Sequence, residues 1–170
     1  MGTIKRYENY PAATVMLSGL VALSIYTLGF LVILRTGFIY SVIYLLYILV
    51  LEYRLVKNHC TDCYYWGKTC AFGRGRISAL FFRKHTQSRF CSKQMTWKDI
   101  LPDFLVSLVP LVTGIIILIL LFDFALLVSL LLLVLLTTIG NGFVRGTLAC
   151  KYCKQKDLGC PADALFNKKK

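Results

Sequence analysis

Six cysteines repeat one spacing at two places in the chain. The spacing is C-x2-C-x6-C, and the second copy lies 90 residues after the first: Cys60, Cys63 and Cys70, then Cys150, Cys153 and Cys160. A tight C-x2-C turn lets two thiolates reach the same ion, and two such turns complete a tetrahedral zinc site. In a reducing cytoplasm such pairs are usually metal ligands or redox thiols. The pattern therefore predicts a bound metal, with zinc favoured.

The grouping of the ligands stays open at this point. In one scheme the two C-x2-C pairs form a single four-thiolate site that clamps the two halves of the chain together. A second site would then use Cys70, Cys160 and Cys91 with one of the two histidines, His59 or His85. In the other scheme each half closes its own site, with Cys91 as the fourth ligand of the first and an outside ligand completing the second.

Other cysteine chemistry has to be weighed beside zinc. Cysteine-rich runs also bind iron–sulfur clusters, and Cys160-Pro161 resembles the Cys-Pro that ends bacterial cluster motifs. Reversible thiol–disulfide chemistry is the third expectation. With two histidines and eight acidic residues, hydrolytic chemistry has few candidates, so a non-catalytic role is favoured over an enzyme.

Four apolar stretches must position these cysteines: residues 12–34, 37–53, 104–122 and 124–144. A helix of about 20 residues spans a ~30 Å hydrocarbon core. The chain is 57% hydrophobic and only 16% charged, which excludes an ordinary soluble domain and a disordered basic tail. The sequence therefore predicts an all-α membrane protein with four transmembrane helices.

Very short links join the first span to the second and the third to the fourth, so we expect two tandem helical hairpins. Repeat 1 covers residues 1–100 and ends in a cysteine-rich basic segment, 54–100. Repeat 2 covers residues 101–170 and ends in a cysteine-rich tail, 145–170. Since each hairpin crosses twice, both copies have the same orientation, which defines a parallel repeat.

The net charge of +12 is concentrated beside the cysteines. The segment from Arg54 to Asp103 has ten Lys and Arg against three acids, and the tail from Arg145 has seven against two. The positive-inside rule then predicts a plasma or inner membrane protein with both termini and both cysteine segments in the cytoplasm. Because this rule already explains the charge, no nucleic-acid partner is expected. The absence of charge at mid-depth disfavours a transport path.

The central segment holds a second candidate site. Arg74 and Arg76 alternate with glycines ahead of an apolar run, a mix that suits a phosphate-bearing ligand or the anionic headgroups of the lipid bilayer. Thr96 and Asp99 have the spacing of a helix capping box.

The leading expectation for function is a cytoplasmic zinc site that clamps the two repeats and forms a docking surface. The surface would take a cytoplasmic or membrane protein, or a second copy of the chain. The alternative is a membrane-surface electron carrier with an iron–sulfur cluster, or a thiol–disulfide oxidoreductase.

Overall fold

The computed structural model describes residues 6–86, 90 and 96–160, and this part of the chain is helical without a strand. The elements are α1 (Ala12–Leu34), α2 (Phe38–Leu55), η1 (Val56–Cys60), α3 (Arg74–Phe81), α5 (Trp97–Leu120), α6 (Phe124–Leu135), η2 (Leu136–Gly140), α7 (Asn141–Phe143), η3 (Val144–Ala149), η4 (Cys150–Tyr152) and α8 (Lys154–Asp157). The segments η1, η2 and η3 are π-helical, and η4 is a 3₁₀ turn.

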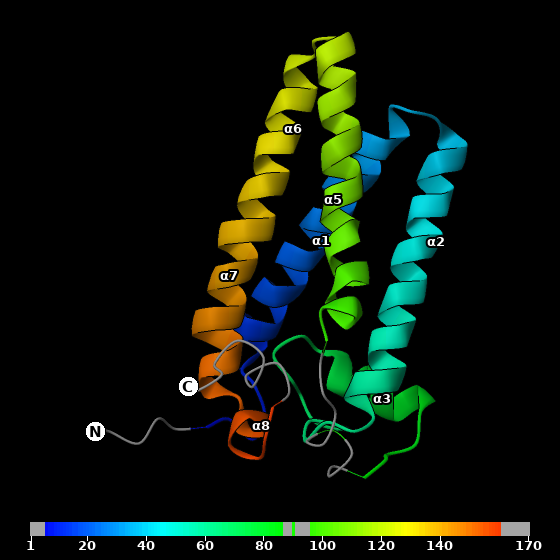
Figure 1. The fold of residues 1–170 in the computed structure, drawn as a ribbon. Coiled ribbons are helices and arrows are strands. Elements are labelled where there is room, and N and C mark those ends of the chain that lie inside the picture. The colour runs from blue at the N-terminus through cyan, green and yellow to red at the C-terminus, as the bar shows by residue number, and fades with distance from the viewer. Residues whose placement is uncertain (1–5, 87–89, 91–95, 161–170) are drawn as a thin grey trace.

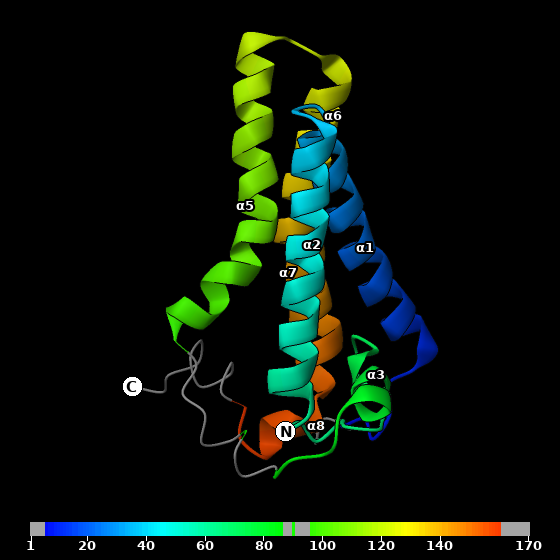
Figure 2. The ribbon, with the colours of Figure 1, turned by 90° about the vertical axis from the view of Figure 1, so that its right-hand side faces the viewer.

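Four of the helical runs are long and apolar enough to cross a membrane, as a multi-pass membrane protein requires. They are Ala12–Leu34, Phe38–Cys60, Asp99–Leu120 and Phe124–Tyr152. Figure 1 shows the α1–α2 and α5–α6 turns at one end of the bundle, with α3 and α8 at the other. In Figure 2, turned by 90°, the α5–α6 turn again lies at the far end from α3 and α8. An ion pair of 3.0 Å between Arg35 and Asp123 joins the two turns.

Three of the helical runs extend beyond the spans that hydropathy predicts. The second run continues to Cys60, past the predicted end at residue 53. The helix α5 begins at Trp97 because the carboxylate of Asp99 accepts hydrogen bonds from the backbone N–H and the hydroxyl of Thr96, at 3.0 and 2.8 Å. These bonds satisfy the helix end ahead of the apolar run. At the other end, the fourth run continues through π-helical turns to Tyr152, past the predicted end at residue 144.

The helix α1 is the centre of the bundle and packs against α2, α5 and α6. Pro110 lies inside α5 and has no N–H to donate to the carbonyl of Val106, four residues earlier. The hydroxyl of Tyr44, from α2, donates to that carbonyl at 2.7 Å. Gly29 of α1 makes room for it, since a methyl group at Gly29 would overlap the Tyr44 hydroxyl. One hydrogen bond therefore joins α2 to α5 beside α1, and it satisfies a carbonyl that would find no water inside a bilayer.

Apolar side chains cover the outside of the bundle. Leu20, Leu49, Ile119 and Leu131 are each more than half exposed, and many others on the same helices are similar. A soluble protein rarely leaves so continuous an apolar surface open. This surface is the one that a lipid bilayer would cover.

Substituting Gly29→Ala tests the packing of α1 against Tyr44. The added methyl group must push the Tyr44 hydroxyl away from the Val106 carbonyl, so we expect a loss of about 1–3 kcal/mol in the free energy of unfolding. The matched control is Gly19→Ala on the same helix, where no described atom lies within 4 Å of the new methyl group. Thermal unfolding in detergent should separate the two. Equal stability of both variants would contradict this packing.

Candidate functional site

Both C-x2-C pairs fold into the same backbone turn. The peptide N–H of Cys63 donates to the carbonyl of Cys60, and that of Cys153 donates to the carbonyl of Cys150, each across 3.4 Å. The carbonyl of each second cysteine then accepts from the peptide N–H three residues further on, at 3.1 Å in the first turn and 3.2 Å in the second. The residues that follow the two pairs differ in type, so the common turn follows from the cysteine spacing.

A π-helical segment leads into each of the two turns. The π-helical η1 ends at Cys60, and the π-helical η3 ends at Ala149, directly before Cys150. Short π-helical segments are rare and occur frequently at functional sites. Each turn thus begins where a membrane-spanning run changes its helical pitch.

Two hydrogen bonds join the turns, one donated from each turn to the other. We call this pair of hydrogen bonds the crossing. The peptide N–H of Tyr64 donates to Oε1 of Gln155 at 2.8 Å, and the peptide N–H of Lys154 donates to the hydroxyl oxygen of Tyr65 at 3.0 Å. Tyr64 and Lys154 each follow the second cysteine of their turn, and Tyr65 and Gln155 come next. The same position of each turn therefore donates to the same position of the other, which is a two-fold pattern made with different side chains.

The side chains that accept these bonds are buried. Tyr65 and Gln155 are each 2% exposed. The Tyr65 hydroxyl also donates to the carbonyl of Tyr7 at 2.7 Å, and Nε2 of Gln155 donates to the carbonyl of Gly159 at 3.2 Å. Both side chains are thus fixed from two sides. Removing either would leave a partly buried peptide N–H without this partner.

Backbone N–H groups also point at the sulfurs of the second cysteines. The N–H of Tyr65 acts to lower the pKa of Cys63, and the N–H groups of Gln155 and Lys156 act to lower that of Cys153. Such donors stabilise a thiolate. The turns therefore already supply part of what an anionic sulfur needs.

Burial nevertheless keeps these two thiols protonated. It raises the pKa of Cys63 to about 12, although the N–H of Tyr65 opposes the rise. Coulombic interaction with Cys153, Cys60 and Cys70 contributes to the same rise in the pKa of Cys63. Burial also raises the pKa of Cys153, against two backbone N–H groups. A cation would reverse the balance by stabilising the thiolates.

The remaining cysteines lie beside these pairs. The sulfur of Cys70 accepts a hydrogen bond from the N–H of Gly75 at 3.3 Å, and Cys160 neighbours Cys153. None of the six described cysteines forms a disulfide bond, and Cys91 lies outside the described residues. Within residues 6–86, 90 and 96–160, no three His, Cys, Asp or Glu side chains are grouped closely enough to hold a metal ion. Zinc ligation and its grouping therefore stay predictions.

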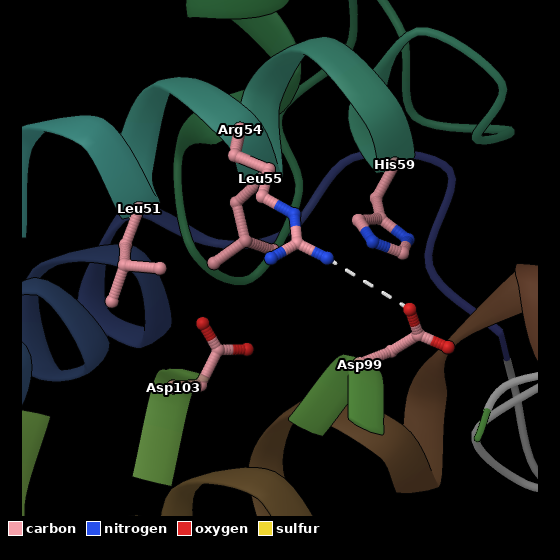
Figure 3. A pocket seen from close by; sticks show the side chains of 6 residues that line it. All are labelled: Leu51, Arg54, Leu55, His59, Asp99 and Asp103. Carbon is pink, nitrogen blue, oxygen red and sulfur yellow. Dashed lines mark ion pairs between the residues drawn. The ribbon is translucent and has the colours of Figure 1, made fainter. Parts of the chain in front are cut away.

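The two histidines lie in different surroundings. Nδ1 of His85 is 3.4 Å from Oδ1 of Asp62, which stands between the two cysteines of the first turn. His59 lines a crevice between the end of α2 and the start of α5 (Figure 3). An ion pair of 3.8 Å between Arg54 and Asp99 spans the crevice. The other residues that line the crevice are Leu51, Leu55 and Asp103.

An N-terminal strap, residues 6–10, lies across both turns. Its backbone donates from Tyr7 to the carbonyl of Tyr152 at 3.1 Å, and from Tyr10 to the carbonyl of Thr69 at 2.9 Å. Arg6 holds both carboxylate oxygens of Asp157 at 2.9 Å. The strap thus bonds to the first cysteine segment and to the second, and it joins them from outside.

One acid of the strap binds cations from both segments. Glu8 pairs with Lys68 at 3.1 Å and with Lys154, and it accepts a hydrogen bond of 2.5 Å from the Tyr64 hydroxyl. Both ammonium groups also lie over the Tyr64 ring, 4.1 and 5.2 Å from its centre. The basic charge expected around the cysteines is therefore partly balanced by Glu8.

The two arginines of the glycine-rich segment have separate environments. Arg74 forms a two-pronged ion pair with Glu52 at the end of α2, and Tyr26 donates to the same carboxylate. Burial alone would lower the pKa of Arg74, but the Glu52 carboxylate outweighs burial and raises it. Arg76 is exposed. Phosphate binding through Arg74 would require opening this ion pair, so Arg76 is the better placed of the two predicted residues.

Comparison with known proteins provides no relative. No protein-family model, no curated protein and no solved structure matches the chain. The function has to be argued from the geometry of the two turns. Sequence reasoning missed the strap and the crossing side chains, Tyr65 and Gln155. Their shared position two residues after a second cysteine was the only available signal.

Substituting Tyr65→Phe or Gln155→Leu tests the crossing. Each change leaves one partly buried peptide N–H without its acceptor, so we expect a loss of about 1–3 kcal/mol in the free energy of unfolding. Tyr152→Phe is the matched control, because the Tyr152 hydroxyl has no hydrogen-bond partner among the described residues. Denaturant unfolding in micelles gives the comparison. If both substitutions are as mild as the control, the crossing is not a stabilising contact.

Proposed function

We propose that the chain is a multi-pass membrane protein in which one zinc ion clamps two tandem hairpins on the cytoplasmic side. The proposed ligands are the four thiolates of the two pairs: Cys60, Cys63, Cys150 and Cys153. One observation carries the proposal: the reciprocal hydrogen bonds from Tyr64 to Gln155 and from Lys154 to Tyr65. Since each bond starts next to a second cysteine, the two bonds join the turns beside Cys63 and Cys153, which supports a shared site; zinc binding would have to bring the four sulfurs closer together.

The surroundings of the sulfurs suit a cation better than free thiols. Backbone N–H groups donate to the sulfurs of Cys63 and Cys153, which favours thiolates, whereas burial without a cation raises both pKa values. A divalent ion resolves this conflict because binding displaces the protons and neutralises the buried charge. Four thiolates around one zinc ion still carry excess negative charge. Lys68 and Lys154, near the turns, would offset it.

A zinc site with four protein ligands has no open position for substrate, so it is structural rather than catalytic. Its effect would be to hold both turns and the N-terminal strap as one rigid surface. We propose that this surface docks a cytoplasmic or membrane protein, or a second copy of the chain. The neighbouring thiols of Cys70 and Cys160 would remain outside the four-ligand set.

The proposal includes a duplicated origin for the two halves. Three features of the first half recur 90 residues later. They are the cysteine spacing, the backbone hydrogen bonds of the turn, and the positions that donate and accept the hydrogen bonds between the turns. A π-helical segment precedes each turn. The excess of Lys and Arg beside both turns supports the cytoplasmic side for this face.

Metal analysis of the purified full chain tests the clamp. We expect about one zinc ion per chain and no visible absorption, as for a structural four-thiolate site. Cys63→Ser and Cys153→Ser should each abolish zinc binding, because each removes a ligand of the same ion. Cys91→Ser is the matched control and should retain the metal.

Three results would reject the shared zinc site. Retention of metal by one of the two serine variants would show that the halves bind separately. A brown protein with broad absorption would indicate the iron–sulfur alternative. Metal-free thiols that cycle reversibly with a reductant would indicate the thiol–disulfide alternative.

A further inference from the structure

The helix α3 has two faces of opposite character. Its inner face carries the buried Gly75 and Ser78, three residues apart, which pack on the rest of the protein. Its outer face carries Ile77, Leu80 and Phe81, which are 47%, 79% and 75% exposed. These three positions share one side of a helix. A large apolar stripe left open on a short helix is unusual and indicates a contact surface.

The outer face continues from the apolar surface of the bundle. Phe82, directly after α3, packs edge-on against Tyr53 of α2 with ring centres 5.6 Å apart. Tyr53, Leu49 and Val50 are themselves more than half exposed on α2. Figures 1 and 2 both show α3 beside the end of α2 that lies away from the α1–α2 turn. A bilayer that covers α2 would therefore end at the level of α3.

Basic residues flank the apolar stripe. Arg76, Arg83 and Lys84 are exposed, and none of them pairs with an acid in the described part of the chain. Arg74 does not belong to this group because Glu52 engages it. Three unpaired cations beside exposed Leu and Phe side chains form the pattern of a helix that lies in a membrane interface.

The helix is fixed in this orientation. A methyl group at Gly75 would overlap the carbonyl of Tyr65 and lie 2.5 Å from that of Lys68, so only glycine permits this close approach. The Gly75 carbonyl accepts a hydrogen bond from Gly67 at 3.0 Å. At the start of α3, Arg74 is tied to Glu52. The apolar stripe therefore cannot turn inward to hide from water.

We propose that α3 is a lipid-binding element: Ile77, Leu80 and Phe81 enter the cytoplasmic leaflet, and Arg76, Arg83 and Lys84 bind the phosphates of anionic headgroups. The inference is independent of the zinc clamp. Each basic residue near an anionic surface should raise the docking equilibrium about fivefold.

Tryptophan quenching in vesicles tests the proposal with the full chain. Leu80→Trp is placed in phosphatidylcholine vesicles with and without phosphatidylserine, and brominated acyl chains serve as the quencher. Leu158→Trp is the matched control, because Leu158 is an exposed leucine directly after α8. In Figure 1, α8 lies further than α3 from the α5–α6 end of the bundle. Phe81→Trp repeats the measurement on the same face if the first variant does not fold.

The expected result is added quenching at position 80 or 81, above that of the native tryptophans, and none at position 158. Phosphatidylserine should increase the quenching, and Arg76→Gln with Arg83→Gln and Lys84→Gln should remove that increase. Equal quenching at positions 80 and 158 would overturn the proposal. Loss of quenching on addition of inorganic phosphate would overturn the lipid as the ligand and indicate a soluble phosphate site.

Discussion

The crossing of the two cysteine turns is the contact on which the aqueous face of this protein depends. Two peptide N–H groups, of Tyr64 and Lys154, are satisfied only by side chains from the other half of the chain. Because the accepting side chains are buried, neither turn can keep its hydrogen bonds without the other. The N-terminal strap adds bonds to both turns and closes the same face from outside.

The four candidate membrane spans meet the same requirement, that polar backbone groups have hydrogen-bond partners, with different residues. Inside a bilayer a free carbonyl has no water to bind, so the carbonyl that Pro110 leaves open must find a protein donor. Tyr44 supplies it, and Gly29 provides the space. The ion pair of Glu52 with Arg74 then links the end of α2 to α3 and so to the first cysteine turn.

Hydropathy and spacing predict the parts of this structure that depend on local sequence. The four helical runs follow from uninterrupted apolar stretches, and the capping of α5 follows from Thr96 and Asp99. The cysteine spacing predicts two equivalent turns. The crossing could not be predicted, because Tyr65 and Gln155 differ chemically and meet only once the helices are packed. The sequence predicts that Arg74 binds phosphate or an anionic headgroup. Its ion pair with Glu52 could not be predicted, because Glu52 lies 22 residues away in sequence.

The central claim is that one ion receives thiolates from both halves of the chain. X-ray absorption at the zinc edge measures the number and type of ligands directly, on the full chain. We expect a shell of about four sulfurs at ~2.3 Å in the full chain, with no nitrogen or oxygen neighbour, and no zinc signal in Cys153→Ser. A four-sulfur shell that Cys153→Ser retains would mean that cysteines of the first half bind the ion alone. A shell of about two sulfurs completed by nitrogen or oxygen at ~2.0–2.1 Å would mean that each turn binds alone, and would contradict the account.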